Sequence, residues 1–240
     1  MPGPAAAMST ARRSSYRAGE NHETLERLRL TIVLVVLSLA TVGGMLLTGW
    51  TVYNHELGDH GAAQIGLGAY ASSGHFLSFV FENWESEFLQ MSAYVMLTAF
   101  LFQRGSAESK DPDASSEVDE NPADKTGDPK APWPVRVGGW VRTAYSYSLG
   151  TALASLFVLT FVLHLRYSAE AENAEAVMHG QPATSMMGHL GSAQFWFESF
   201  KNWQSEFLST AVVVVLSIFL RFRGSPESKP VAPPHSKTGA

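Results

Sequence analysis

The chain has no cysteine. This absence excludes disulfide bonds, zinc sites built from thiolates, and catalysis by a thiol nucleophile. Charged side chains are also missing from two long stretches, residues 31–50 and 143–165. As a helix that rises about 1.5 Å per residue, each stretch is long enough to cross a hydrocarbon core of about 30 Å. These absences indicate a membrane protein.

Two further apolar blocks, residues 88–102 and 207–220, are shorter. Each reaches about 30 Å only when it is extended back across a tryptophan and forward to an arginine. The first long block follows a polar lead and has no small-residue cleavage site directly after it, so we interpret it as a retained helix and not a signal peptide. We expect four transmembrane helices, over about residues 21–60, 73–104, 142–179 and 192–223.

The chain contains an internal repeat with a shift of 119 positions. Residues 54–110 align without a gap with residues 173–229, and 23 of these 57 positions are identical. The segment ENWESEFL, which starts at Glu82, returns as KNWQSEFL from Lys201, and both copies end in RGSxESK. Because each copy is expected to hold two helices, the repeat predicts two helical hairpins in tandem.

Positive charges predict the orientation of these hairpins. Of the 17 Lys and Arg residues, only Arg166 and Lys201 fall on the side opposite the termini. Both termini and the middle linker should therefore face the cytoplasm, and the hairpins should be parallel repeats about an axis along the membrane normal. The predicted fold class is all-α, a four-helix transmembrane bundle with disordered tails and a disordered cytoplasmic linker.

The connections predict where these parts begin and end. The linker holds seven acidic residues between Asp111 and Asp128, and the Pro132-Trp133-Pro134 segment after it is expected to be extended. Gly61 is expected to end the first helix in the left-handed conformation. The expected division is a tail over 1–20, a first hairpin over 21–110, the linker over 111–131, a second hairpin over 132–229 and a tail over 230–240.

Polar side chains inside the second and fourth expected helices form one candidate site. At 100° per residue they fall on a stripe about 100° wide on each helix. A carboxylate at the bilayer centre costs about 2.5–3.5 kcal/mol, so both stripes should face inward. There the carboxylates would share a proton or hold a cation, unless the stripes only cross-link the helices by hydrogen bonds. The candidate residues are Asn83, Ser86, Glu87, Gln90, Asn202, Ser205 and Glu206.

A second candidate site is a Glu-x-x-x-His pair that occurs in both copies, as Glu56 with His60 and as Glu175 with His179. Glu and His four residues apart share one helical face, and two such pairs could hold a divalent metal such as zinc, manganese or iron. A histidine just before a helix-ending glycine also interacts favourably with the helix C-terminus. We favour this capping interpretation and expect no cofactor.

Several motifs are specific enough to suggest a family. The segments FENWESEFLQ and KNWQSEFLS, the two RGSxESK endings and PWPVR in the linker resemble a family of uncharacterised bacterial membrane proteins, defined only as a domain of unknown function. The resemblance covers about residues 21–235. It implies a bacterial inner-membrane location and carries no activity.

Three functions stay open. The chain could be a structural or accessory helix bundle, a small carrier of ions, protons or polar solutes that uses Glu87 and Glu206, or a membrane enzyme that uses the Glu/His pairs. The inner halves of the second and fourth helices, residues 95–101 and 212–220, are almost wholly apolar, which disfavours an open pore. We therefore favour the accessory bundle over a carrier. We also favour it over an enzyme, for which only the Glu/His pairs qualify as a site. The expected partners are the lipid bilayer and a second copy or another membrane protein, with no nucleic acid.

Overall fold

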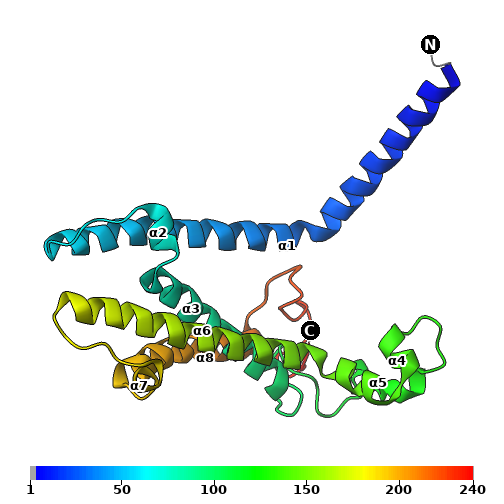
Figure 1. Cartoon of the computed structure of the whole chain (residues 1–240). Coiled ribbons are helices and arrows are strands. Elements are labelled where there is room, and N and C mark those ends of the chain that lie inside the picture. Colours follow the sequence, from blue (N-terminus) through cyan, green and yellow to red (C-terminus); the bar gives the residue numbers. More distant parts are fainter. Residues whose placement is uncertain (1–3, 240) are drawn as a thin grey trace. The chain divides into compact units, whose positions relative to one another are not determined.

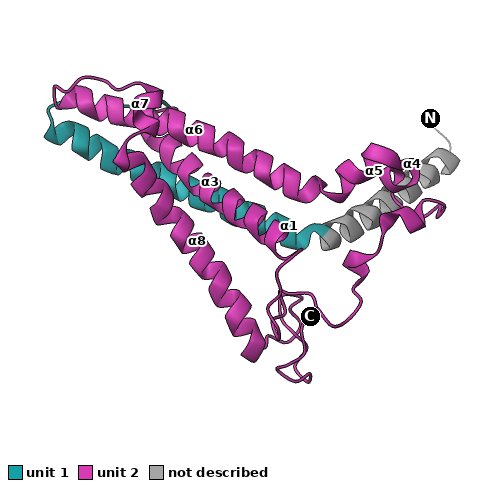
Figure 2. Ribbon diagram, turned by 90° about the horizontal axis from the view of Figure 1, so that it is seen from below, with its two compact units in different colours: residues 1–71 teal, residues 72–240 magenta. Residues whose placement is uncertain are grey.

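The computed structural model describes residues 4–239, with side chains from Leu28 onward. Helices are the only regular secondary structure in this described part of the chain (Figure 1). The predicted all-α class is therefore confirmed. The chain divides into two units, residues 1–71 and 72–240 (Figure 2). The predicted disordered tail over residues 1–20 lies outside the residues whose side chains are described, and it stays a prediction.

Unit 1 contains α1 (Pro4–Asp59) and the short α2 (Leu67–Ala71). Gly61 follows α1 with a φ of 68°, the left-handed conformation expected at this helix end. The chain then folds back, because the side-chain amide of Asn54 binds both the backbone N–H and the carbonyl of Ile65, at 2.8 and 3.0 Å. Tyr70 of α2 is 1% exposed and lies over Gly49, where a Cβ would overlap the Tyr70 hydroxyl.

Unit 2 is built on three long helices, α3 (Gly74–Leu97), α6 (Ser148–Met178) and α8 (Ala193–Phe219). α3 packs mainly against α6 and also contacts α8 (Figure 2). α3 and α6 run antiparallel, since Gly74 lies against Glu170 while Met96 lies against Gly150. A Cβ on Gly74 would come within 2.8 Å of the Glu170 Cβ, so this close approach depends on glycine.

Shorter elements complete unit 2. α4 (Trp133–Val137) and α5 (Gly139–Ser146) precede α6, and α7 (Met186–Leu190) precedes α8. The linker contains two turns of 3-10 helix, η1 (Glu117–Asp119) and η2 (Pro122–Lys125). Ion pairs of 2.5 Å join Arg104 to Asp113 and Lys110 to Asp119, so the linker is tied to the RGSxESK turn that precedes it.

Several predicted boundaries are wrong. α3 ends at Leu97 and not near Arg104. Directly after Leu97, the Thr98 hydroxyl bonds back to the Tyr94 carbonyl and the chain leaves the helix. α8 likewise ends at Phe219, four residues before the expected end. The third expected helix is divided at Tyr147 into α5 and α6. The Pro-Trp-Pro segment starts α4 and is not extended, because a proline fits the first turn of a helix.

The linker and the C-terminal residues were expected to be disordered, yet the structure gives both defined contacts. The Thr238 hydroxyl accepts a hydrogen bond from the Gly105 N–H, and the Gly239 N–H donates to the Ser106 carbonyl, each at 2.9 Å. The Lys229 ammonium group donates to the carbonyls of His235 and Lys237. Composition did not predict these contacts because each has a backbone group on at least one side, and such groups are the same in every residue type.

Positions that the 119-residue shift pairs make matching local contacts. The Ser73 and Ser192 hydroxyls cap the first turns of α3 and α8. The Asn173 side chain binds the backbone of Thr184 through both its amide atoms, as Asn54 does in unit 1. Gly180 follows α6 with a φ of 64°. The hairpin ends are therefore built alike in both copies.

Three helices are long and apolar enough to cross a membrane: Leu28–Asp59 within α1, α6, and α8. The expectation of helices that could span a membrane is confirmed for these three. α3 is not among them, because it carries Glu82, Glu85 and Glu87 along its middle turns. A four-helix bundle stays a prediction.

Candidate functional site

The most buried ionisable groups of unit 2 form one contact between α3 and α6. The Glu85 carboxyl group and the His164 ring share a hydrogen bond, with 2.6 Å between Oε2 and Nδ1. Both side chains are essentially without solvent exposure, at 1% and 0%. The second carboxylate oxygen, Oε1, accepts a hydrogen bond of 2.8 Å from the Trp203 indole on α8. One carboxylate thus connects all three long helices.

The two nitrogens of the His164 ring have different surroundings. Nδ1 shares its hydrogen bond with Glu85, and the ring tautomer decides which of the two partners donates. The other ring nitrogen, Nε2, is buried and has no hydrogen-bond partner among the described side chains. It faces the Glu198 carboxylate at 4.0 Å, and Glu198 is 25% exposed. Nε2 is therefore the ring atom that is not engaged in the contact with Glu85.

A second buried carboxylate lies one turn earlier on α3. Glu82 is 5% exposed, and its Oε1 accepts a hydrogen bond of 2.6 Å from the Asn202 amide. The Lys201 ammonium group approaches the same oxygen at 3.5 Å. Glu82 therefore has both a hydrogen-bond donor and a positive charge from α8, and this pairing makes its burial tolerable.

Aromatic rings shield the His164 ring from solvent. Phe195 is 0% exposed, and its ring centroid lies 5.0 Å from that of His164 and 5.4 Å from that of His189. His189 is itself buried, hydrogen-bonds the Ser168 hydroxyl at 2.8 Å through Nε2, and contacts the Glu172 carboxylate through Nδ1. Two buried imidazoles, each beside a carboxylate, thus lie against one apolar ring.

The predicted polar stripe is only partly at the contact between α3 and α8. Asn202 binds Glu82, Gln90 donates to the Thr210 hydroxyl at 2.5 Å, and the Glu87 and Glu206 carboxyls lie within reach of each other. The remaining members make local contacts: Ser86 is buried and bonds the Asn83 carbonyl, while Asn83 and Ser205 are exposed. Glu87 is exposed as well, although its carboxyl group lies near that of Glu206.

Asn83 and Glu87 are exposed, and the inward direction predicted for them stays a prediction. α3 packs chiefly on α6, so its most buried face carries Glu82, Glu85 and Ser86. The prediction assumed that the facing helix was the repeat counterpart of α3, which is α8. The packing of α3 against α6 turns the buried face away from the predicted one.

The Glu/His pairs make the contact that helix capping predicts. The His60 and His179 rings each bond a backbone carbonyl four residues earlier, that of Glu56 and that of Glu175, at 2.9 Å. Within the described part of the chain, no group of three His, Asp or Glu side chains is placed to hold a metal ion. A metal at these pairs stays a prediction.

Sequence reasoning missed the central residues because it followed the repeat. Glu82 and Glu85 correspond to Lys201 and Gln204, so a search for shared residues passes over them. His164 lies in a block without formal charge, which was interpreted only as a membrane span. The available signal was a histidine inside an apolar segment, because polar residues at such positions are costly and usually functional.

Comparisons with known proteins agree with the motifs. No curated protein matches the chain, and no solved structure matches it. The family described as Domain of unknown function (DUF6766) matches residues 21–240, which is most of the chain. The chain therefore belongs to the DUF6766 family, whose function its description leaves open.

Proposed function

We propose that the chain is a multi-pass membrane protein that carries protons, and that the Glu85–His164 pair is its proton-binding group. The observation that supports this most strongly is a carboxylate and an imidazole, 2.6 Å apart and without solvent exposure, inside an apolar helical unit. Ionisable groups in such surroundings are expensive and are retained mainly where they act on ions or protons.

The proposed proton step uses His164 Nε2. With Nε2 unprotonated, the buried pair has a net charge of −1, because Glu85 is ionised and the ring is neutral. A proton added at Nε2 makes the ring cationic and the pair neutral overall. Glu198 supplies this proton from the partly exposed side, since a separation of 4.0 Å from Nε2 is one that a single water bridges.

Polar contacts between α3 and α8 would continue the path. From Glu82 with Asn202, the series proceeds to Glu87 with Glu206 and then to Gln90 with Thr210. Successive members are three to five residues apart on α3, about one helical turn. This series supports a proton path along residues 82–90 of α3, the stretch that carries the predicted polar stripe.

We further propose that α3 is the fourth spanning helix, in a bacterial inner membrane with both termini in the cytoplasm. The charge distribution of the sequence and the family motifs support this topology. Reporter fusions after Ala69 and Ser185 should report a periplasmic location, and a fusion at Ser115 a cytoplasmic one. A cytoplasmic report at Ala69 would contradict the topology.

Proton flux into liposomes tests the proposed function. Vesicles that contain the purified chain and a pH-sensitive dye are given a potassium-diffusion potential, and the change in internal pH is recorded. We expect flux above that of protein-free vesicles, and its loss in His164→Gln and in Glu85→Gln. The control is His55→Gln, the same change at an exposed ring that pairs only with Asp59. Wild-type flux no greater than that of empty vesicles would refute the proposal.

The accessory helix bundle is the second candidate. It is favoured by the hydrogen bonds that join α3 to α8, Asn202 to Glu82 and Gln90 to Thr210, since such bonds stabilise helix association in membranes. A protein that conducts no protons but loses helix association when these bonds are removed would be a bundle of this kind.

A further inference from the structure

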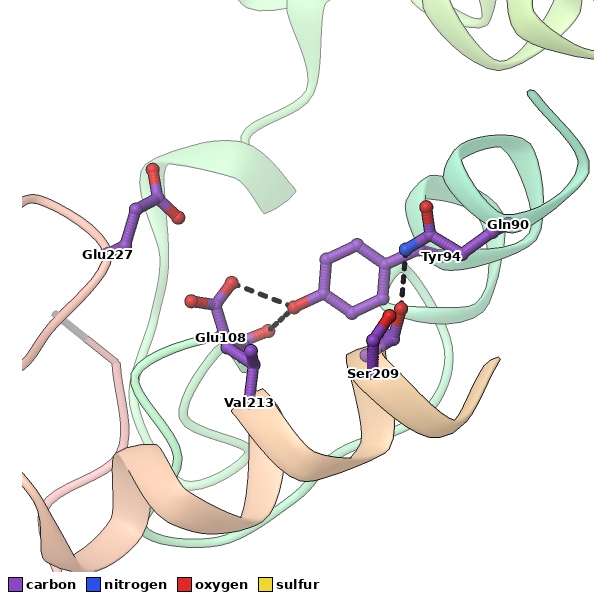
Figure 3. Close-up of a pocket in the computed structure, with 7 residues that line it drawn as sticks. Gln90, Tyr94, Glu108, Ser209, Val213 and Glu227 are labelled. Carbon is purple, nitrogen blue, oxygen red and sulfur yellow. Dashed lines mark hydrogen bonds between the residues drawn. The ribbon is translucent and has the colours of Figure 1, made fainter. Parts of the chain in front are cut away.

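A cavity lies where α3 and α8 approach their C-terminal ends. It has a volume of about 380 Å³, within the range of small-molecule pockets, and Figure 3 shows residues that line it. It is lined by three pairs of positions that the 119-residue shift relates: Gln90 and Ser209, Tyr94 and Val213, Glu108 and Glu227. Both copies of the repeat thus contribute corresponding positions to one cavity.

Two carboxylates give the cavity a negative charge. Glu108 accepts a hydrogen bond of 2.8 Å from the Tyr94 hydroxyl through Oε2, and both Glu108 and Glu227 act electrostatically on that hydroxyl. Figure 3 shows the two carboxylates on the loops beyond Tyr94. No lysine or arginine lines the cavity within the part of the chain that the structure describes.

Three of the neighbouring basic residues have other partners. In the first RGSxESK segment, Arg104 binds Asp113 and Lys110 binds Asp119. In the second, Lys229 donates to two backbone carbonyls of the C-terminal residues. The repeated turns therefore direct positive charges away from the cavity and leave two glutamates at its wall, which favours a cation as the ligand.

The walls of the cavity also indicate that the cation has an apolar part. The Tyr94 ring and the Val213 side chain provide apolar surface, so a ligand with only polar surface would leave them poorly matched. Gln90 uses its amide nitrogen on Thr210, which leaves its carbonyl oxygen as an acceptor. A primary ammonium group has three N–H donors and can bind two carboxylates and one amide oxygen at once.

We propose that this cavity binds a small alkylammonium ion, with its ammonium group between the Glu108 and Glu227 carboxylates and its alkyl chain against Tyr94 and Val213. The ligand is a monovalent organic cation taken from the side of the membrane that the RGSxESK turns face. Binding is an equilibrium property and needs no proton gradient, so this inference stands apart from the proposed proton function.

Saturation-transfer NMR tests the proposal with the full chain in nanodiscs of zwitterionic lipid. The probe is butylammonium at millimolar concentration, and 1-butanol and butyrate serve as its neutral and anionic counterparts. We expect saturable binding of butylammonium above that of empty nanodiscs, with neither counterpart competing. The variants Glu227→Gln and Glu108→Gln should each raise the Kd at least tenfold. Glu117→Gln is the matched control, because Glu117 is an exposed linker acid outside the cavity.

Each outcome decides the proposal. Glu227 is exposed on a loop, so Glu227→Gln should keep the helix content and unfolding transition of the wild type, and a loss of binding then reports the site. Binding of butanol as tight as that of butylammonium would overturn the role of charge. Displacement of butylammonium by an equal concentration of potassium or magnesium would overturn the assignment to an organic cation, as would an unchanged Kd in both cavity variants.

Discussion

The Glu85–His164 contact can be tested through the stability of the fold. Replacing Glu85 by Leu removes the hydrogen-bond partner of both the buried His164 ring and the partly buried Trp203 indole. Breaking a buried charged pair by removing one partner costs about 3–5 kcal/mol, much of which is restored when the other partner is also made apolar. Interhelical hydrogen bonds between neutral groups in membranes contribute only about 0.6 kcal/mol, with a maximum of about 1.7 kcal/mol. The size of the stability loss therefore distinguishes a charged pair from a neutral hydrogen bond that only joins two helices.

A double-mutant cycle measures this difference. Glu85→Leu, His164→Leu and the double variant are unfolded reversibly by SDS in mixed micelles, and the free energies of unfolding are compared. We expect each single variant to lose about 3–5 kcal/mol, and the double variant to lose less than the sum of the two. The Gln90–Thr210 contact, tested as Gln90→Leu and Thr210→Val, is the neutral control cycle. A coupling energy for Glu85 and His164 no larger than that of this control would refute the charged centre.

Three further predictions concern the frame around the site. Gly74→Ala should lower the free energy of unfolding by about 1–3 kcal/mol, because its Cβ would meet α6 at 2.8 Å, whereas Gly127→Ala, which adds its Cβ in open space, should have little effect. Asn173→Ala should remove two hydrogen bonds and speed amide exchange in the connection before α7. The hydrogen bond and charge of Arg104 hold the pKa of Asp113 below its usual range. The pair therefore stabilises the fold above the unfolded pKa of about 4, and this small contribution is lost as the pH falls through the lower folded pKa. Asp113→Asn should remove that acid-dependent part of the unfolding curve.

The sequence predicted the helices well because their signals are local. Uncharged runs set the spans, and Ser73, Ser192, Gly61 and Gly180 mark hairpin ends through capping and left-handed backbone that need no tertiary partner. Boundaries beyond Leu97 and Phe219 were missed, because the apolar composition continues past the residues where the backbone leaves the helix. Apolar character alone does not specify helix against extended chain.

The candidate site was less predictable because it depends on which helices meet. A helical wheel gives the angle between side chains on one helix but not the direction of the neighbour. The repeat suggested that α3 faces α8, whereas α3 packs chiefly on α6 and buries Glu85 against His164. His164 has no counterpart in the first copy, where the matching position is Met45, so the repeat could not predict their contact.

Two pairs of matching positions on α3 and α8 differ in their charges: one pair is oppositely charged and the other carries like charges. Glu82 lies beside its own counterpart Lys201, at 3.5 Å, so the charges at this pair of positions are opposite and attract. Glu87 lies beside its counterpart Glu206, and both copies keep the acid. Two carboxylates in contact repel unless they share a proton or a cation, so the retained pair is costly to a purely structural bundle and useful to a protein that moves protons. Glu87→Lys makes this pair opposite in charge, like the pair of Glu82 and Lys201. We expect the variant to raise the free energy of unfolding and to abolish proton flux. That result would identify the repulsion between the two carboxylates as part of the function.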